Sequence, residues 1–216
     1  MGDKVAMAAG ASPLDRVAPF VVHDDFLPAE EHRALLDWTL EQELDFRPSH
    51  LGTGAVDAAI RSSGRLPAHH DQPWKERFAS RIRTLLPELI EGLAIQPLAC
   101  KAIELELARH NDGDFYRRHI DTALKSERRA GTRTISAVYY FHAEPQGFSG
   151  GALRLHAFSR RDGNDRFSDI VPVQNRLVAF PSWAPHQVMP IRCPSGRFED
   201  SRFSINCWVH RTPPDQ

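Results

Sequence analysis

The spacing of apolar residues changes near residue 98 and divides the chain into a helical part and a strand-rich part. Within 74–93 apolar side chains recur every three or four positions, the period of an amphipathic helix. A charged helix is also predicted, in which Pro28 is the first helical residue and residues 29–43 follow it. Pro87 predicts a kink or a break near Leu86, because proline lacks the N–H group and clashes with the preceding turn.

From residue 98 onward, short apolar or alternating runs bounded by glycine, proline and asparagine predict strands. The predicted strands are residues 99–107, 134–141, 153–157, 169–172, 177–180, 186–188 and 202–209. In the last strand the odd positions from Phe203 to Val209 are apolar, whereas Arg202 and Asn206 belong to the polar face. The predicted fold class is therefore α+β and mainly β, with helices that support a sheet.

The stretch between the two predicted helices interrupts the periodicity. Residues 46–72 contain several prolines and glycines, Arg61 and the pair His69-His70. This composition is typical of a long loop, and long loops in compact domains are often functional. Two interpretations stay open, a lid over a substrate site and a surface loop without a function.

The predicted organisation is a leader at 1–17, which we expect to be flexible, followed by one domain at 18–216. Within this domain, residues 18–97 supply the helical support and the long loop, and residues 98–210 supply the strands. No internal repeat divides the chain further.

Length, cysteine content and charge limit the classes of function. A chain of 216 residues can bury a sizeable core, and three scattered cysteines favour a reducing, cytoplasmic compartment. With 27 basic and 28 acidic residues the formal charge is −1, so no field attracts nucleic acid or a membrane surface. No apolar run of about 18 residues predicts a transmembrane helix. Whether the protein is a monomer or a homodimer stays open.

Candidate chemistry comes from pairs in which an acidic residue follows a histidine by two positions. In a strand such residues point the same way, about 6.6 Å apart, so both can reach one metal ion. Roughly one such pair is expected by chance in this composition, and a pair alone is ordinarily a surface or capping contact. The chain has five, namely His23/Asp25, His69/Asp71, His110/Asp112, His119/Asp121 and His142/Glu144.

The residues that surround and follow His119 distinguish one pair from the others. In order they are the charged stretch 114–121, the aromatic strand 133–141, a Gly-Gly pair with a short strand at 150–156, His186, and the strand that Arg202 opens. This order resembles the prolyl 4-hydroxylase-like branch of the Fe(II)/2-oxoglutarate-dependent dioxygenases over residues 100–210, about half of the chain. The resemblance implies a double-stranded β-helix, or jelly roll, with the N-terminal helices packed outside the major sheet.

The resemblance implies a role for each matching residue. His119, Asp121 and His186 correspond to a 2-His-1-carboxylate facial triad, which holds Fe(II) and leaves coordination positions open. Arg202 corresponds to the residue that binds the distal carboxylate of 2-oxoglutarate, for which a guanidinium offers a planar fork of donors, and Tyr140 to a hydrogen-bond donor to that carboxylate. Further residues expected around the pocket are Tyr116, Asn206, Trp208 and Arg61.

Two positions depart from the family pattern. Some relatives carry a tyrosine ten positions before the first metal ligand, where this chain has Arg109 with His110 beside it, so a cosubstrate contact from Arg109 is in doubt. The inserted loop 193–201 contains Arg197, which is the rival of Arg202 for the carboxylate. We prefer Arg202 because it opens an alternating strand, whereas Arg197 lies in turn-like sequence.

The resemblance implies a dioxygenase that uses Fe(II), 2-oxoglutarate and O2, with ascorbate as an optional reductant, to hydroxylate an unactivated C–H bond and release succinate and CO2. The carboxylate of Asp121 favours oxygen transfer, because related halogenases carry a small residue there. The sequence does not decide between a prolyl residue of a peptide or protein and a small molecule as substrate. A third reading is a non-catalytic, cupin-like metal-binding module, closed by a fourth ligand from His110, His142 or His156.

Overall fold

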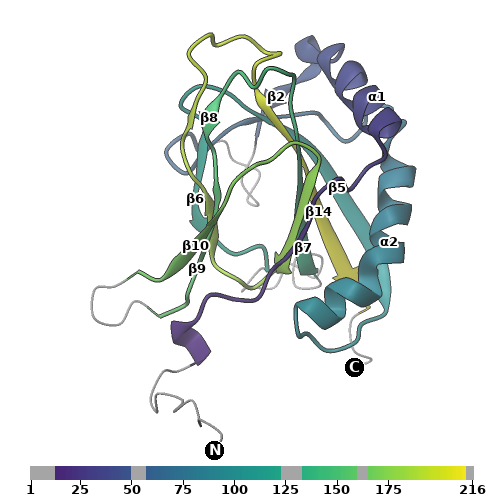
Figure 1. Ribbon diagram of the computed structural model, residues 1–216, viewed down its shortest axis with the longest axis vertical. Helices are drawn as coiled ribbons and strands as arrows, with labels where there is room; N and C mark the ends of the chain where they lie inside the picture. Colours follow the sequence, from purple (N-terminus) through teal and green to yellow (C-terminus); the bar gives the residue numbers. More distant parts are fainter. Residues whose placement is uncertain (1–12, 50–56, 123–132, 160–164, 213–216) are drawn as a thin grey trace, which may run out of the picture.

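The structure, a computed structural model, describes residues 13–49, 57–122, 133–159 and 165–212. Two sheets face each other, and two helices lie against the outer side of the larger sheet (Figure 1). All neighbouring strands within the described residues pair in antiparallel fashion. This arrangement confirms the mainly β jelly roll that the resemblance implies.

The larger sheet has the order β1-β11-β7-β14-β5-β4-β2. Its strands are β1 (Val21–His23), β11 (Arg176–Pro181), β7 (Arg133–Phe141), β14 (Arg202–Arg211), β5 (Cys100–His110), β4 (Gly64–Arg65) and β2 (Arg47–Pro48). The smaller sheet has the order β10-β9-β12-β6-β3. Its strands are β10 (Phe167–Ile170), β9 (Leu153–His156), β12 (His186–Val188), β6 (Phe115–His119) and β3 (Arg61–Ser62). A separate pair joins β8 (Ser149–Gly150) to β13 (Ile191–Arg192).

The two helices are α1 (Ala29–Leu40) and α2 (Lys75–Gly92), and short 3-10 helices span Pro13–Asp15 and Glu43–Asp45. Pro28 precedes α1 with an extended backbone, so it is the N-cap and not the first helical residue as predicted. Of the kink or break predicted near Leu86, the break is wrong, because α2 continues through Pro87. Buried side chains on both sides of the proline, Ile82 and Leu89 among them, hold the helix against the sheet.

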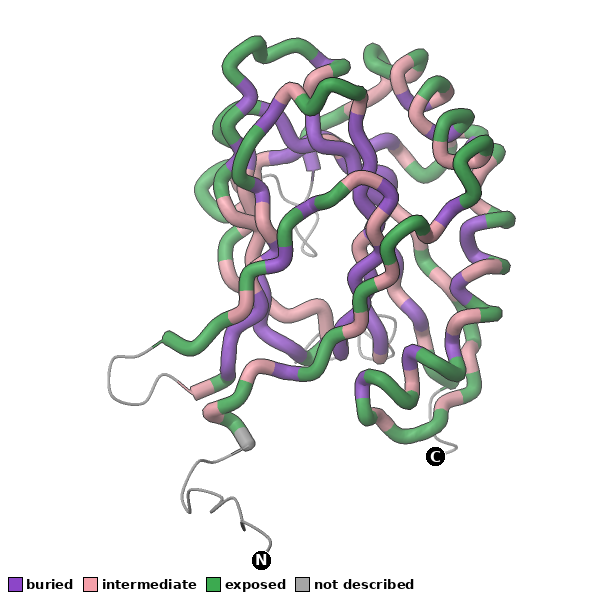
Figure 2. The backbone as a smooth tube through the Cα atoms, viewed as in Figure 1, coloured by how far each residue is buried: buried purple, intermediate pink, exposed green. Residues whose placement is uncertain are grey.

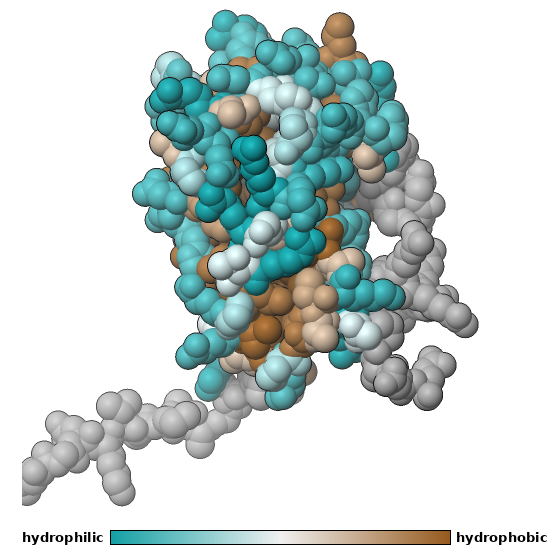
Figure 3. All heavy atoms as spheres, turned by 90° about the vertical axis from the view of Figure 1, so that its right-hand side faces the viewer, coloured by the Kyte–Doolittle hydropathy of each residue, from teal (hydrophilic) through white to brown (hydrophobic). Residues whose placement is uncertain are grey.

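Strand parity separates two apolar layers. The odd-numbered residues of β7 and β14, such as Tyr139 and Ile205, pack with the helices in one core, whereas Tyr140 packs with the smaller sheet in the other. Figure 2 shows the buried stretches along the strands and the exposed stretches at loops and on the outer side of the helices. The helices turn mostly hydrophilic side chains outward, with an apolar area near the bottom of the view in Figure 3. The face of the larger sheet that points away from the helices and toward the smaller sheet lines a pocket.

The segment 46–72 contributes strands to both sheets instead of forming one long loop. β3 pairs Arg61 with Tyr116 of β6, and β4 pairs Gly64 with Arg109 of β5. The segment therefore lies at the edge of the pocket, although its residues 50–56 fall outside the described part of the chain. Of the predicted leader, residues 1–12 also fall outside it. Within the described residues, no helix is long and apolar enough to cross a membrane.

Candidate metal centre and its pocket

Three of the predicted site residues converge at one end of the smaller sheet. His119 and His186 are direct partners in the pairing of β6 with β12, and their ring centroids lie 4.1 Å apart. Asp121 lies just beyond β6, where its N–H donates to the carbonyl of Ser182 at 2.9 Å. Its two carboxylate oxygens lie 3.6 Å from Nε2 of His119 and 3.6 Å from Nε2 of His186. Of the described histidine, cysteine and acidic residues, these three form the one group whose ligand atoms all lie within 4.8 Å.

Backbone carbonyls orient both imidazoles. Nδ1 of His119 lies 2.8 Å from the carbonyl oxygen of Arg117, and Nδ1 of His186 lies 3.0 Å from that of Ala184. A carbonyl only accepts, so each Nδ1 donates, and each neutral ring has its lone pair on Nε2. Burial, together with His119, lowers the pKa of His186 to about 4, so this ring is neutral at pH 7. Both rings are thus in the tautomer that a metal ion requires.

Asp121 is held as an oriented carboxylate. Burial acts to raise its pKa, but the facing His186, His119 and the hydroxyl of Ser136 outweigh burial and lower the pKa well below the usual range. The Ser136 hydroxyl donates to Oδ2 at 2.6 Å and also lies 2.9 Å from the hydroxyl of Ser182. The contact of Ser136 with Asp121 depends on pairing between distant strands, so it could not be predicted from the sequence.

Replacing Ser136 by alanine is expected to weaken metal binding by about 10- to 100-fold, the usual cost of losing a partner that orients a metal ligand. The affinity for Co(II) or Mn(II), measured by competition with a chelating dye, tests this expectation. Thr39→Ala is the matched control, because the buried Thr39 hydroxyl donates to the Leu35 carbonyl in α1, away from the pocket. Equal metal affinities of the two variants would contradict an orienting role for Ser136.

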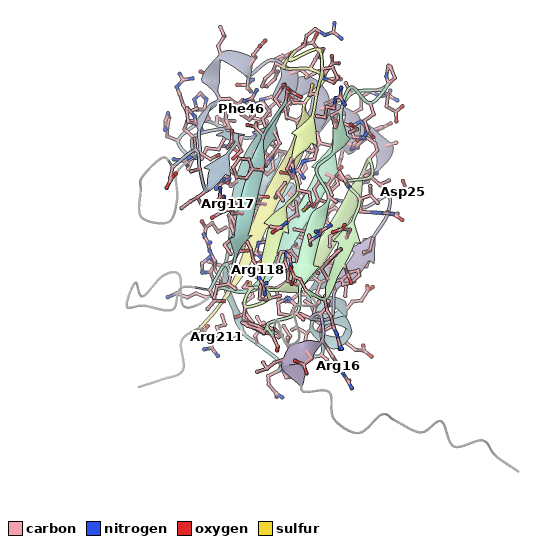
Figure 4. All side chains as sticks on the ribbon, turned by 90° about the vertical axis from the view of Figure 1, so that its left-hand side faces the viewer. Arg16, Asp25, Phe46, Arg117, Arg118 and Arg211 are labelled. Atoms are coloured by element: carbon pink, nitrogen blue, oxygen red, sulfur yellow. The ribbon has the colours of Figure 1, made fainter. Side chains whose placement is uncertain are left out.

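An irregularity in β6 brings Tyr116 to the same side as His119. The pairing aligns His186 with His119 and Val188 with Tyr116, so β6 holds one extra residue between these pairs. As a result the rings of Tyr116 and His119 stack with centroids 3.6 Å apart. Arg118 turns outward and donates to the carbonyl of Ala157 at 2.7 Å, and Figure 4 shows it on this side of the molecule. Tyr116 therefore lines the pocket.

A buried cation lies in the same pocket, on the larger sheet. Arg202 is 1% exposed, and its guanidinium donates to the carbonyl of Gly151 at 2.8 Å and to Nδ1 of His110 at 2.9 Å. The guanidinium carbon lies 5.2 Å from the ring centroid of Tyr140. Burial raises the pKa of Tyr140 to about 12, so its hydroxyl stays protonated. Within the described residues no carboxylate forms an ion pair with Arg202, so the pocket offers a binding place for an anionic ligand.

The two alternative arginines lie elsewhere. Arg197 is in an exposed loop, with 63% of its side chain accessible, and pairs with Asp200 at 2.9 Å. Arg109 points away from the pocket, where its guanidinium lies 3.9 Å from Asp114. The inward position on this part of β5 belongs to His110. From the sequence we considered His110 as a metal ligand and assigned it no contact with the cosubstrate.

The outer part of the pocket contains the remaining predicted residues, Asn206, Trp208 and Arg61. Arg61 donates to Glu106 at 2.8 Å, and Asn206 donates to the same carboxylate oxygen at 3.3 Å. Arg61 also lies over the ring of Tyr116, 5.1 Å from its centroid. Sequence reasoning missed Glu106. Glu106 lies opposite Asn206 in the β14–β5 pairing, and the sequence carries no signal for it because this register is not visible there.

None of the three histidines considered as a fourth ligand joins the group. His110 contacts Arg202, His142 has Nδ1 2.8 Å from the carbonyl of Ala143, and His156 faces Asp165 at 3.1 Å. The group of described ligands therefore stays at two imidazoles and one carboxylate. Structural zinc sites are usually closed by four protein ligands, whereas three ligands leave positions open for chemistry. The arrangement favours a catalytic centre.

Comparison with known proteins agrees with this class of fold and site. Residues 105–210 match the family model described as the 2OG-Fe(II) oxygenase superfamily. The chain is 34% identical over 194 residues to an uncharacterized PKHD-type hydroxylase of Synechocystis sp., a match that covers 87% of this chain. The match covers 61% of that relative, so the chain spans less than two thirds of its length.

Among solved structures, a Pseudomonas putida prolyl-4-hydroxylase is 26% identical with a TM-score of 0.65, over 91% of this chain and 94% of that chain. A prolyl hydroxylase from Trichoplax adhaerens, solved with a peptide of hypoxia inducible factor, has a TM-score of 0.67 at 21% identity and covers 89% and 84% of the two chains. That second likeness concerns the fold. The fold is the jelly roll of these enzymes, and residues 105–210 of the chain are similar to the 2OG-Fe(II) oxygenase superfamily.

Proposed function

We propose that the protein is an Fe(II)- and 2-oxoglutarate-dependent dioxygenase that hydroxylates an unactivated C–H bond. The observation that carries this proposal is the convergence of His119, Asp121 and His186 in one pocket with the buried Arg202. These side chains come from segments far apart in the sequence. A non-catalytic metal-binding module would not account for the buried Arg202 in the same pocket.

The donor set fits Fe(II). An ion about 2.1 Å from each ligand brings adjacent donor atoms about 3 Å apart, close to the separations of 3.6 Å between Asp121 and each imidazole. Two Nε2 atoms with available lone pairs and one carboxylate are the ligands of the facial triad. His119, Asp121 and His186 would therefore hold the iron on one side.

The other residues bind and orient the cosubstrate. When bound, Fe(II) and 2-oxoglutarate supply the oxygen-activating chemistry, in which one atom of O2 enters succinate, the other enters the C–H bond, and CO2 leaves. Arg202 binds the distal carboxylate and the Tyr140 hydroxyl donates to it, so both fix the position of the 2-oxo acid. Leu153, Phe180 and Val138 provide apolar walls that keep water away from this end of the pocket.

For the substrate we propose a prolyl residue of a peptide or protein. The support is the likeness to a prolyl-4-hydroxylase of similar length, together with the aromatic side chain of Trp208 in the outer pocket, against which a proline ring can pack. Arg61 and Glu106 add a charged pair beside Tyr116, which offers polar contacts to a peptide backbone. A free amino acid is the competing substrate class.

Anaerobic addition of Fe(II) and then 2-oxoglutarate is expected to produce a visible metal-to-ligand charge-transfer band. Intact metal binding without this band would contradict the oxygenase proposal and favour the non-catalytic module. Succinate release with proline-containing peptides, free proline and other amino acids then tests the substrate class. Stimulation by free amino acids alone would overturn the peptidyl assignment, and assays with and without ascorbate test its role as a reductant.

A further inference from the structure

Two buried polar atoms at the cationic end of the pocket lack a hydrogen-bond partner among the described residues. They are Nε of Arg202 and Nε2 of His110. The two residues are direct partners in the pairing of β14 with β5, and both line the pocket. Buried polar groups are almost always hydrogen bonded, so two such atoms on neighbouring residues that line one pocket mark the place of a polar ligand.

The contact between the two residues settles the tautomer of His110. Its Nδ1 lies 2.9 Å from a terminal nitrogen of Arg202. A guanidinium has donors and no acceptor, so Nδ1 accepts. Burial and the charge of Arg202 also lower the pKa of His110 well below its usual value, so the ring is neutral. The one hydrogen of the ring is therefore on Nε2, which is the buried donor without an acceptor.

Hydrogen bonds from both terminal nitrogens hold the guanidinium of Arg202 in place, and this in turn fixes the position of the His110 ring. One terminal nitrogen of Arg202 donates to the carbonyl of Gly151 and the other to His110. Gly151 allows this close approach, because its φ is +69° and a Cβ there would lie 2.6 Å from Ile191. His110 is 3% exposed, so its ring has little freedom to turn. The donor at Nε2 is preorganised for one position in the pocket.

We propose that His110 is a further cosubstrate-binding residue, whose Nε2–H donates a hydrogen bond to a carboxylate oxygen of 2-oxoglutarate. This inference rests on the proposed function. The ring links the cation to the cosubstrate, because it accepts from Arg202 at Nδ1 and donates from Nε2. A neutral donor adds a hydrogen bond without adding a second positive charge beside the buried guanidinium.

The test is the affinity for 2-oxoglutarate of the protein loaded with Zn(II), measured by calorimetry. His110→Ala is expected to raise the Kd about 10- to 100-fold, the effect of removing a hydrogen bond to a charged group. His110→Gln is expected to recover most of the affinity, because its amide can accept from Arg202 and donate to the carboxylate. Zn(II) affinity is expected to stay unchanged in both. His142→Ala is the matched control, because His142 is a buried histidine outside this pocket.

Two analogues locate the contact. Succinate lacks the 2-oxo group and pyruvate lacks the distal carboxylate. Weaker succinate binding by His110→Ala places the contact at the distal carboxylate, and weaker pyruvate binding places it at the 1-carboxylate. Unchanged binding of both analogues and of 2-oxoglutarate would overturn the proposal. If wild-type protein binds no 2-oxoglutarate, the proposed function fails instead.

Nitrogen-15 NMR of the Zn(II) protein separates a direct contact from an effect through Arg202. Addition of 2-oxoglutarate is expected to shift the proton on Nε2 of His110 downfield, as a new hydrogen bond to a carboxylate forms. A saturated complex in which this proton does not move would overturn the proposal, even if His110→Ala and His110→Gln both bind weakly. His110 would then only position the guanidinium.

Discussion

Replacing His119 by alanine is expected to lower the affinity for Fe(II) by more than about 100-fold and to abolish the charge-transfer band. Loss of a residue that merely orients a ligand already costs about 10- to 100-fold, and loss of a ligand itself costs more. His119 also anchors the geometry, because it is the pairing partner of His186 and lies 3.6 Å from the Asp121 carboxylate. Competition titration with Co(II) under anaerobic conditions measures the loss.

His69→Ala is the matched control for this prediction. His69 belongs to another His-x-Asp pair, but it is exposed and outside the ligand group. Metal affinity of this variant is expected to match that of the unmodified protein. Circular dichroism of both variants checks the fold. A folded His119→Ala protein that still binds Co(II) tightly would show that the metal lies elsewhere.

Replacing Arg202 by alanine is expected to weaken 2-oxoglutarate binding by about 100-fold or more while metal binding persists. A buried carboxylate that loses its charged partner pays much of its desolvation cost without compensation. The substitution also leaves His110 and the Gly151 carbonyl without their donor, so a modest loss of stability is expected as well. Titration of the charge-transfer band with 2-oxoglutarate gives the affinity.

Arg197→Ala provides the control that decides between the two arginines. Arg197 is exposed and pairs with Asp200 and Glu199 in its loop, so its removal is expected to change the affinity for 2-oxoglutarate by less than about twofold. Arg202→Lys keeps the charge but not the planar fork and is expected to bind with intermediate affinity. A strong loss in Arg197→Ala with little change in Arg202→Ala would contradict our assignment of the cosubstrate pocket.

The local part of the fold could be predicted from the sequence. Strand parity in the last strand placed Asn206 on the pocket side and Phe203 on the core side, because side chains alternate with a period of two. The predicted strand at 186–188 agrees with β12 as observed. The core strand β5, in contrast, extends to His110 instead of ending near residue 107. Edges of elements depend on neighbouring strands, which the sequence does not display.

Contacts between distant strands could not be predicted. The Ser136–Asp121 hydrogen bond and the His110–Arg202 contact join residues 15 and 92 positions apart, and each requires a particular strand register. Simple alternation would place Tyr116 on the opposite side of β6 from His119. An extra residue in β6 brings Tyr116 into the pocket instead. Tertiary packing also keeps α2 from ending at Pro87, since the helix continues through this residue.

The long pairing of β14 with β5 supplies side chains both to the hydrophobic core and to the pocket, so few changes in β14 are tolerated. Its register runs from Arg202 opposite His110 to Val209 opposite Ile103, with alternate residues committed to the core and to the pocket. A single-residue insertion in β14 would exchange the two faces, turning Phe203 toward the cosubstrate and a guanidinium toward the helices. Engineering of substrate selectivity should therefore leave β14 and β5 unchanged. The better positions to vary are in β3, which contains Arg61, and in the turns next to it.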